Sequence, residues 1–234
     1  MSYLIFDDID SSDYGVMVFE KNSFNAPHRN ISVQSVPGKN GDVLNDEGNY
    51  GNIEREFDCI VYANMYNQLA DFRDAICSKI GYQRIETPIH PDEFFMGYLA
   101  DETDIKTDSS GELAKFRLTF NCKPQRFLKS GETVVTFEES GTIINPTNQT
   151  SLPSLVVYGS GVVGIGDVSF TISAADGYTE IDCEAMICKK GTTPKGQYVS
   201  FSQYEYPTLK PGSNGISLGT GITKVEIMPR WYRL

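Results

Sequence analysis

The chain has 234 residues, with 20 Lys and Arg against 31 Asp and Glu, and a formal net charge of −11 at pH 7. This acidity excludes a protein that binds nucleic acid through a basic surface, because a phosphate backbone would be repelled. Hydrophobic residues make up 40% and charged residues 22%, which is typical of a folded chain and not of a disordered one. Most of the net charge, −8 (13 basic against 21 acidic residues), falls in residues 1–130.

The first residues and the cysteines bear on where the chain is made. Residues 1–10 contain no basic start followed by an apolar run, so no signal peptide is expected. No segment approaches the roughly 18 apolar residues that a membrane span requires, so no membrane partner is expected either. We therefore expect synthesis in the cytoplasm, where an odd number of cysteines (five) favours free thiols over disulfides.

The beginning of the chain shows the alternating pattern of β-strands. Residues 31–36 alternate between apolar and polar side chains with a period of two. Residues 37–42 follow as a turn cluster, in which Pro37 fixes its own φ while Gly38 and Gly41 permit left-handed backbone. The two features together predict a strand that leads into a tight turn.

A second strand is predicted over residues 51–62. One of its faces carries the acidic side chains of Glu54, Glu56 and Asp58. The other face carries Ile53, Phe57, Cys59 and Val61. We expect this strand to be exposed at a sheet edge, where it could extend the sheet of a neighbouring molecule.

One amphipathic helix is predicted after this strand. Its apolar stripe, with steps of three and four residues, consists of Met65, Leu69, Phe72, Ile76 and Ile80. Asn64 suits the N-cap and Gly81 the C′ position, so both ends carry stop signals. Because only one face is apolar, the helix should pack on one side of a sheet.

The pattern then returns to strands and reaches a boundary. Strands are predicted through residues 84–128, with a hairpin tip at 108–111, and the apolar pattern pauses at 128–131. We therefore expect a first domain over 1–130 and a second over 131–234. The whole chain is predicted to be mainly β (α+β).

The second half is predicted to be a small antiparallel β-sandwich. Its strands are expected over residues 155–158, 168–173, 178–188 and 225–228. In the third of these, apolar and acidic residues alternate, as expected of a sheet with one solvated face. No helical period is visible here, which favours two packed antiparallel sheets.

Motifs that could bind a cofactor or metal are weak. Residues 159–164 match GxGxxG, but the next residues have a strand pattern and not the helix that holds a pyrophosphate, so we expect a hairpin loop. His28 and His90 lie far apart in the sequence. Cys183 and Cys188 should point to opposite faces of one strand. We therefore expect neither a cofactor nor a metal site.

Catalytic groups are also scarce, so the chain is not expected to be an enzyme. It has two histidines and no G-x-S-x-G nucleophile elbow. Carboxylate pairs such as Glu138–Glu139 arise by chance in so acidic a chain, and a solvated acidic surface is the simpler interpretation. Trp231, the single tryptophan, fits a core anchor better than an exposed platform for stacking sugars or a partner.

Several short segments, in their order, resemble the distal tail proteins of siphophages that infect Gram-positive bacteria. Residues 36–42 match the family's VPG-[RK]-x-G signature, including Pro37, Gly38 and Gly41, although Lys39 and Asn40 stand where many members have Arg and Asp. Further similar segments are residues 50–54, 69–73, 120–124, 180–184, 206–214 and 229–231, the last of which includes Trp231. The resemblance covers nearly the whole chain.

The resemblance implies a structural role at the distal end of the phage tail. It implies a homo-hexameric ring whose first domain is like a tail-tube subunit and surrounds a channel through which DNA only passes. The second domain would be a peripheral sandwich like galectins and carbohydrate-binding modules. Expected partners are the tail tube protein, the tail-associated hub or lysin protein, and receptor-binding components.

Two further hypotheses follow. Glu54, Glu56 and Asp58 would approach the channel, where negative charge keeps DNA from adhering. The alternative function is a carbohydrate-binding module that recognises host cell-wall polysaccharide, and a third, a wall hydrolase, is disfavoured by the poor catalytic inventory.

Overall fold

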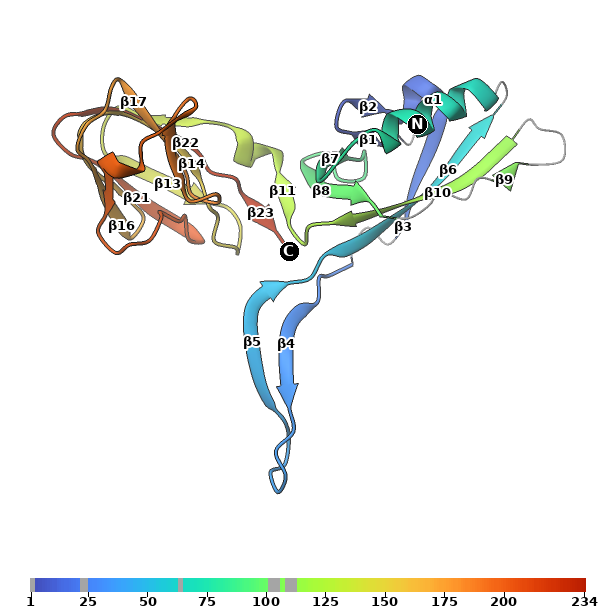
Figure 1. Ribbon diagram of the computed structural model, residues 1–234, viewed down its shortest axis with the longest axis horizontal. Helices are drawn as coiled ribbons and strands as arrows, with labels where there is room; N and C mark the ends of the chain where they lie inside the picture. Colours follow the sequence, from blue (N-terminus) through green and yellow to red (C-terminus); the bar gives the residue numbers. More distant parts are fainter. Residues whose placement is uncertain (1–2, 22–24, 63–64, 101–105, 108–112) are drawn as a thin grey trace. The chain divides into compact units, whose positions relative to one another are not determined.

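The computed structural model in Figure 1 describes residues 3–21, 25–62, 65–100, 106–107 and 113–234. The chain forms two compact units, Met1–Arg126 with Leu234, and Phe127–Arg233. Antiparallel strands dominate both units, and the described residues contain one α-helix. The predicted mainly β class is therefore confirmed.

The first unit is built on one antiparallel sheet with the strand order β2-β1-β7-β8-β10-β6-β3. Its elements are β1 (Ile5–Phe6), β2 (Ile9–Asp10), the 3-10 helix η1 (Ser11–Tyr14), β3 (Val16–Lys21), β6 (Ile53–Tyr62), β7 (Gln83–Glu86), β8 (Glu93–Leu99), β10 (Leu113–Cys122) and β9 (Lys106–Thr107), which pairs with β10. β6 pairs with β10 on one side and with β3 on the other. The prediction of an edge strand over residues 51–62 is wrong, because both sides of β6 are already hydrogen-bonded.

Alternation along β6 and β10 turns their apolar side chains toward a common core. The fully buried aromatic side chains of this core are Phe6, Phe57, Phe72, Phe95 and Phe120. The helix α1 (Met65–Cys77) supplies Phe72 and Ile76, which pack on the inner face of this sheet. The predicted stripe therefore packs against the sheet at Leu69, Phe72 and Ile76, whereas the predicted member Ile80 does not.

The helix ends earlier than the sequence indicates. The amide of Lys79 donates to the carbonyl of Ile76 (3.2 Å), a tighter turn than an α-helix, and Lys79 Nζ forms ion pairs with Asp7 (2.7 Å) and Asp8. Ile80 is 89% exposed, and Gly81, with φ +77°, lies beyond the helix. The predicted N-cap, Asn64, and the predicted hairpin tip at 108–111 lie outside the described residues.

A two-stranded ribbon, called the arm below, is formed by β4 (Arg29–Gln34) and β5 (Val43–Tyr50). Figure 1 shows these two strands as a ribbon separate from the large sheet, and they hydrogen-bond only to each other in the described part of the chain. The chain enters the arm after β3 and returns into β6. The turn cluster with Gly38 and Gly41 connects the two arm strands.

The second unit is a sandwich of two antiparallel sheets, with orders β12-β22-β14-β17-β18-β19 and β13-β21-β15-β16-β20. The first sheet contains β12 (Val135–Phe137), β14 (Ser154–Gly159), β17 (Tyr178–Asp182), β18 (Ile187–Lys190), β19 (Thr193–Pro194) and β22 (Ile222–Met228). The second contains β13 (Gly141–Asn145), β15 (Gly161–Ile165), β16 (Val168–Ile172), β20 (Val199–Phe201) and β21 (Gly212–Leu218). The remaining elements are β11 (Arg126–Leu128), β23 (Tyr232–Arg233) and the 3-10 helices η2 (Lys129–Glu132) and η3 (Gly196–Tyr198).

Inward-facing side chains of both sheets form one core. It includes Leu155, Val157, Ile165, Phe170, Ile181, Ile227 and Trp231. Trp231 is 5% exposed, and its carbonyl accepts a hydrogen bond from the Leu128 amide (2.8 Å). This is the place of a core anchor and not of an exposed aromatic platform.

Two local predictions for this unit are wrong. Residues 159–164 do not form a hairpin loop, because β14 belongs to one sheet and β15 to the other, so the chain crosses between sheets at Ser160. Gly159 and Gly161 permit this corner through positive φ values (+101° and +155°), and the backbone of Gly221 lies where a side chain at 159 would stand. The segment 178–188 is not one strand, because β17 ends at Asp182 and a turn precedes β18.

Candidate functional site

The outer face of the β3–β6–β10 sheet carries the three acidic residues singled out from the sequence. Glu54 is exposed, and Glu56 and Asp58 are half-buried on the same face. Arg117 on β10 lies 3.3 Å from Glu56 and 3.0 Å from Asp58. Lys21 on β3 lies 2.6 Å from Asp58. The hydrogen bond from Lys21, followed by that from Arg117, holds the pKa of Asp58 below its usual range.

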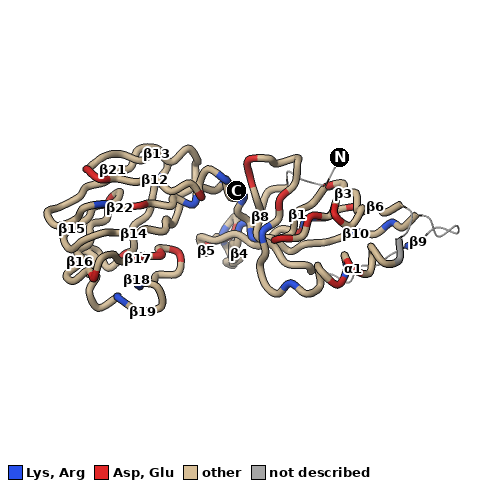
Figure 2. The backbone as a smooth tube through the Cα atoms, turned by 90° about the horizontal axis from the view of Figure 1, so that it is seen from above, with Lys and Arg blue, Asp and Glu red and all other residues tan. Residues whose placement is uncertain are grey.

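These cations change the charge of the face from what the single strand indicated. Opposite residues of an antiparallel pair share a face, so Lys21 (opposite Glu56), Arg117 (opposite Asp58) and Lys115 (opposite Ile60) lie on the face of the β6 acids. On these three strands, the three acidic side chains of β6 are therefore matched by three basic ones. Figure 2 shows both signs along β3, β6 and β10. The expected acidic face is a mixed one, because the sequence of one strand does not identify its neighbours.

The inner face of β6 holds a charged group that the sequence interpretation passed over. Arg55 is 6% exposed and forms an ion pair with Glu20 of β3, whose other carboxylate oxygen accepts from Thr87 Oγ1 (3.0 Å). The Arg55 guanidinium also lies 3.4 Å from the ring centroid of Phe95. The alternation of β6 places Arg55 on the apolar face, which was the available signal. A buried pair of this kind is costly to break, because either partner alone would be an unpaired buried charge.

The arm presents apolar side chains to solvent. Alternation and the cross-strand pair Val33–Leu44 place Ile31, Val33 and Leu44 on one face of the ribbon. These side chains are 41%, 60% and 64% exposed. A two-stranded ribbon with no third strand is marginally stable in water, and exposed apolar clusters mark interaction surfaces. The arm is therefore the strongest candidate for a contact with another protein chain.

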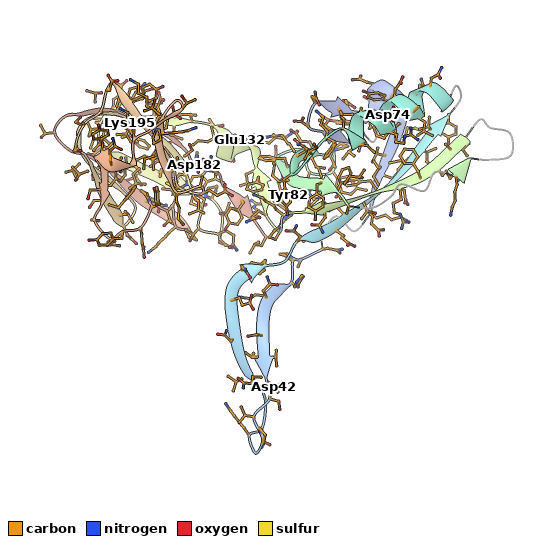
Figure 3. The ribbon with its side chains drawn as sticks, in the orientation of Figure 1. Asp42, Asp74, Tyr82, Glu132, Asp182 and Lys195 are labelled. Carbon is orange, nitrogen blue, oxygen red and sulfur yellow. The ribbon has the colours of Figure 1, made fainter. Side chains whose placement is uncertain are left out.

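The motif with Pro37, Gly38 and Gly41 forms the tip of the arm. The amide of Lys39 donates to the carbonyl of Val36 (3.1 Å), which closes a turn around Pro37 and Gly38. Gly38 and Gly41 have φ values of +83° and +81°, in the region that glycine adopts without steric cost. Figure 3 labels Asp42 at this end of the ribbon. The glycines predicted to permit left-handed backbone do so here.

The aromatic side chains of the second unit differ in how open they are: Tyr204 is 99% exposed, whereas a pair of tyrosines on the first sheet is partly covered. Tyr158 and Tyr178 are neighbours on β14 and β17, with ring centroids 5.9 Å apart. Lys224 Nζ lies 4.1 Å from the Tyr158 centroid and Lys190 Nζ 5.4 Å from that of Tyr178. Trp231 is buried. Each of these two tyrosine rings therefore has a lysine ammonium group near it, where a stacked sugar ring would have to lie.

Catalytic and metal-binding groups remain dispersed. His28 lies at the base of the arm, whereas His90 is buried with its Nδ1 3.7 Å from Glu93. Cys183 and Cys188 stand on different segments and both point into the core, which corrects the expectation of opposite faces. Burial raises the pKa of the Cys183 thiol to about 12, far from that of a nucleophile.

The described ranges hold neither a cluster of metal ligands nor a helix that could span a membrane. No three His, Cys, Asp or Glu side chains in them gather as metal ligands. No helix in these ranges is both long and apolar enough to cross a bilayer.

Comparison with known proteins finds similarity in structure only. No family model and no curated protein matches this sequence. The chain is similar to the crystal structure of the SPP1 Dit protein, described as a paradigm of the hub adsorption apparatus in phages that infect Gram-positive bacteria. The TM-score is 0.77 and the identity 14%, over 100% of both chains.

Two structures of the phage p2 baseplate in its activated conformation are also similar. The one with calcium gives a TM-score of 0.54 at 13% identity over 97% of each chain. The one with strontium gives 0.52 at 12% identity over 100% of this chain and 98% of the other. Because the similarity to the SPP1 protein extends over both chains entirely, this chain has the fold of SPP1 Dit.

Proposed function

We propose that this chain is a distal tail protein of a siphophage, a structural ring subunit at the tail tip and not an enzyme. Six copies form the ring, the first domain encloses a channel, and the second lies at the periphery. The ring connects the tail tube protein to the hub or baseplate and to receptor-binding components. The observation that carries this proposal is the fold shared with SPP1 Dit along the full length of both chains.

The arm supports assembly from identical copies. A closed ring needs two different patches on each subunit, one of which fits the other on the next copy. The exposed apolar face of Ile31, Val33 and Leu44 supplies one such patch. A neighbouring copy that covers this face would remove apolar surface from water and stabilise the two-stranded ribbon. The arm of each copy therefore docks on the next copy in the proposed ring.

The outer face of β6 is proposed to line the channel. Its acids Glu54, Glu56 and Asp58 stand among Lys21, Lys115 and Arg117, and two of these cations are held in ion pairs. A surface with balanced charges offers no excess of positive charge to hold a phosphate backbone. DNA would then pass without binding.

A mass measurement tests the proposed ring. Light scattering after size exclusion, over a range of concentrations, should show a species of six copies of the 26.0 kDa chain, 156 kDa. Negative-stain images of that fraction should show annuli with six lobes. A chain that stays monomeric at high concentration, both alone and with its tail tube and hub partners, would contradict the proposal.

A further inference from the structure

The chain contains two Asn-Gly pairs, Asn40-Gly41 and Asn214-Gly215, in very different surroundings. An Asn-Gly pair is chemically vulnerable, because the glycine has no side chain to hinder attack of its backbone nitrogen on the asparagine side chain. The attack needs freedom of the backbone and of the asparagine amide. The folded protein decides whether each pair has this freedom.

Asn40 has it. It is exposed at the tip of the arm, beyond the Gln34–Val43 pair that ends the arm's ladder. Gly41 has φ +81°, and no atom of the described residues lies within 4 Å of where its Cβ would be. The turn hydrogen bond from Lys39 to Val36 closes before Asn40. Loop tips of this kind are where chemical and proteolytic change concentrates.

Asn214 is held on all sides. It lies in β21, opposite Ile143, and is 4% exposed. Its Nδ2 donates to the carbonyls of Lys210 (2.8 Å) and Gly212 (3.0 Å), and its Oδ1 accepts from the Lys210 amide (2.9 Å). Attack at its side chain would break these bonds and the strand pairing. The fold therefore prevents the cyclisation at Asn214-Gly215.

We propose that Asn40 is a site of spontaneous deamidation, whereas Asn214 is protected. The deprotonated amide nitrogen of Gly41 attacks Cγ of Asn40, the new N–Cγ bond closes a five-membered imide, and the Cγ–Nδ2 bond breaks with release of ammonia. Water then opens the imide at either carbonyl and leaves aspartate or isoaspartate. The reaction needs only water and accelerates with pH, because the attacking nitrogen must lose its proton.

The change alters the arm tip in two ways. Each conversion adds one negative charge, which takes the chain from −11 to −12 at pH 7. Isoaspartate also inserts one more carbon into the backbone at the turn. If the arm docks on a neighbouring copy, which rests on the proposed function, a docked tip is restrained and converts more slowly than a free one.

Timed incubation followed by peptide mass spectrometry tests the proposal. The folded full-length chain should gain about one mass unit at Asn40, faster at alkaline pH, with release of ammonia and no gain at Asn214. In guanidinium chloride both residues should convert, because the fold that protects Asn214 is gone. Asp176-Gly177 can form the same imide, but it loses water and not ammonia, so its products keep their mass.

A variant at Asn40 and a comparison of assembled with unassembled protein provide further tests. Asn40→Gln should abolish the gain in mass, since a glutamine forms the larger ring far more slowly. Equal conversion of both asparagines in the folded chain, or none at Asn40 while both convert in denaturant, would overturn the proposal. Separated ring and subunit fractions should differ in their converted share. If the ring and subunit fractions contain equal proportions of converted Asn40, the idea that assembly slows deamidation is wrong. The proposal that Asn40 deamidates would still stand, because the mass spectrometry tests it independently.

Discussion

At the residue scale, the ion pair between Asp182 and Arg230 makes the free energy of unfolding depend on pH. Arg230 Nη1 and Nη2 donate to the two carboxylate oxygens of Asp182, each at 2.9 Å. The amides of Glu184 and Ala185 also donate to this carboxylate (3.0 Å each). The pair, labelled at Asp182 in Figure 3, lowers the pKa of Asp182 to about 2, with Arg230 as the main cause.

We predict that this pair loses its effect between about pH 4 and pH 2. The pKa in the folded state lies below the unfolded value of about 3.9, so the pair stabilises the fold above that pH and less as Asp182 becomes protonated. Asp182→Asn keeps a side-chain oxygen for the two amides and removes the charge. It should lower the free energy of unfolding by about 1–2 kcal/mol at neutral pH. Denaturant titrations should show wild type and variant converging toward pH 2; a constant difference would contradict this.

Gly38 permits a second prediction at this scale. Gly38→Val places a β-branched side chain at φ +83°, which should cost about 1 kcal/mol or more. Among the described strands, β4 and β5 pair only with each other, so this strain should speed hydrogen exchange in β4 and β5 and leave the thermal melt of the rest unchanged. Lys39→Val, at an ordinary φ, is the matched control. A lowered melting temperature would mean that the tip is coupled to the core.

At the scale of the element, the arm combines exposed apolar side chains with a minimal hydrogen-bond ladder. Interior strands of the large sheet, such as β6, have a hydrogen-bonded neighbour on each side and one buried face. Within the ranges that the structure describes, β4 and β5 have one neighbour each, and no residue of either is fully buried. β4 nevertheless alternates apolar and polar residues, although neither of its faces is buried in the folded subunit.

The arm is predicted to matter for assembly and not for folding. Leu44→Lys replaces an apolar side chain that is 64% exposed, so the melt of the isolated subunit should not change. Leu44 would no longer be buried against a second copy. The protein concentration at which half of the chains are assembled should therefore rise by roughly tenfold or more. The matched control is Ile144→Lys on β13, where the side chain is 69% exposed. Equal effects of the two changes, measured by light scattering, would rule out a specific role for the arm.

At the scale of the whole molecule, the chain forms two separate hydrophobic cores. One core gathers around the aromatic side chains of β6, β8, β10 and α1, and the other between the two sheets of the sandwich. Each unit buries its own apolar surface. A substitution in the core of one unit should therefore destabilise that unit and leave the stability of the other unchanged.

Calorimetry can detect this independence. Phe72→Ala should weaken the first unit, and Trp231→Ala the second, by about 3–5 kcal/mol each, because both side chains are buried. Each variant should lower one thermal transition and leave the other in place. Trp231→Phe, which retains most of the buried ring, is the milder control. One joint transition that moves with both variants would contradict two independent cores.

The sequence by itself determined the features that a single segment encodes. Alternation predicted the strands around Phe57 and Ile181, the stripe through Phe72 and Ile76 predicted one helix face, and Gly38 and Gly41 predicted left-handed turns. These succeed because a side chain's direction follows from the backbone of its own element.

Only the tertiary structure decided what stands beside each element. Pairing of β6 with β3 and β10 brought Lys21 and Arg117 to the acidic residues and Glu20 to Arg55, over sequence separations that no local pattern reports. The same pairing made β6 an interior strand, and the two-sheet arrangement turned residues 159–164 into a corner. Long-range pairing depends on the packing of the whole core, so it is decided when the chain folds and not by the period of any one segment.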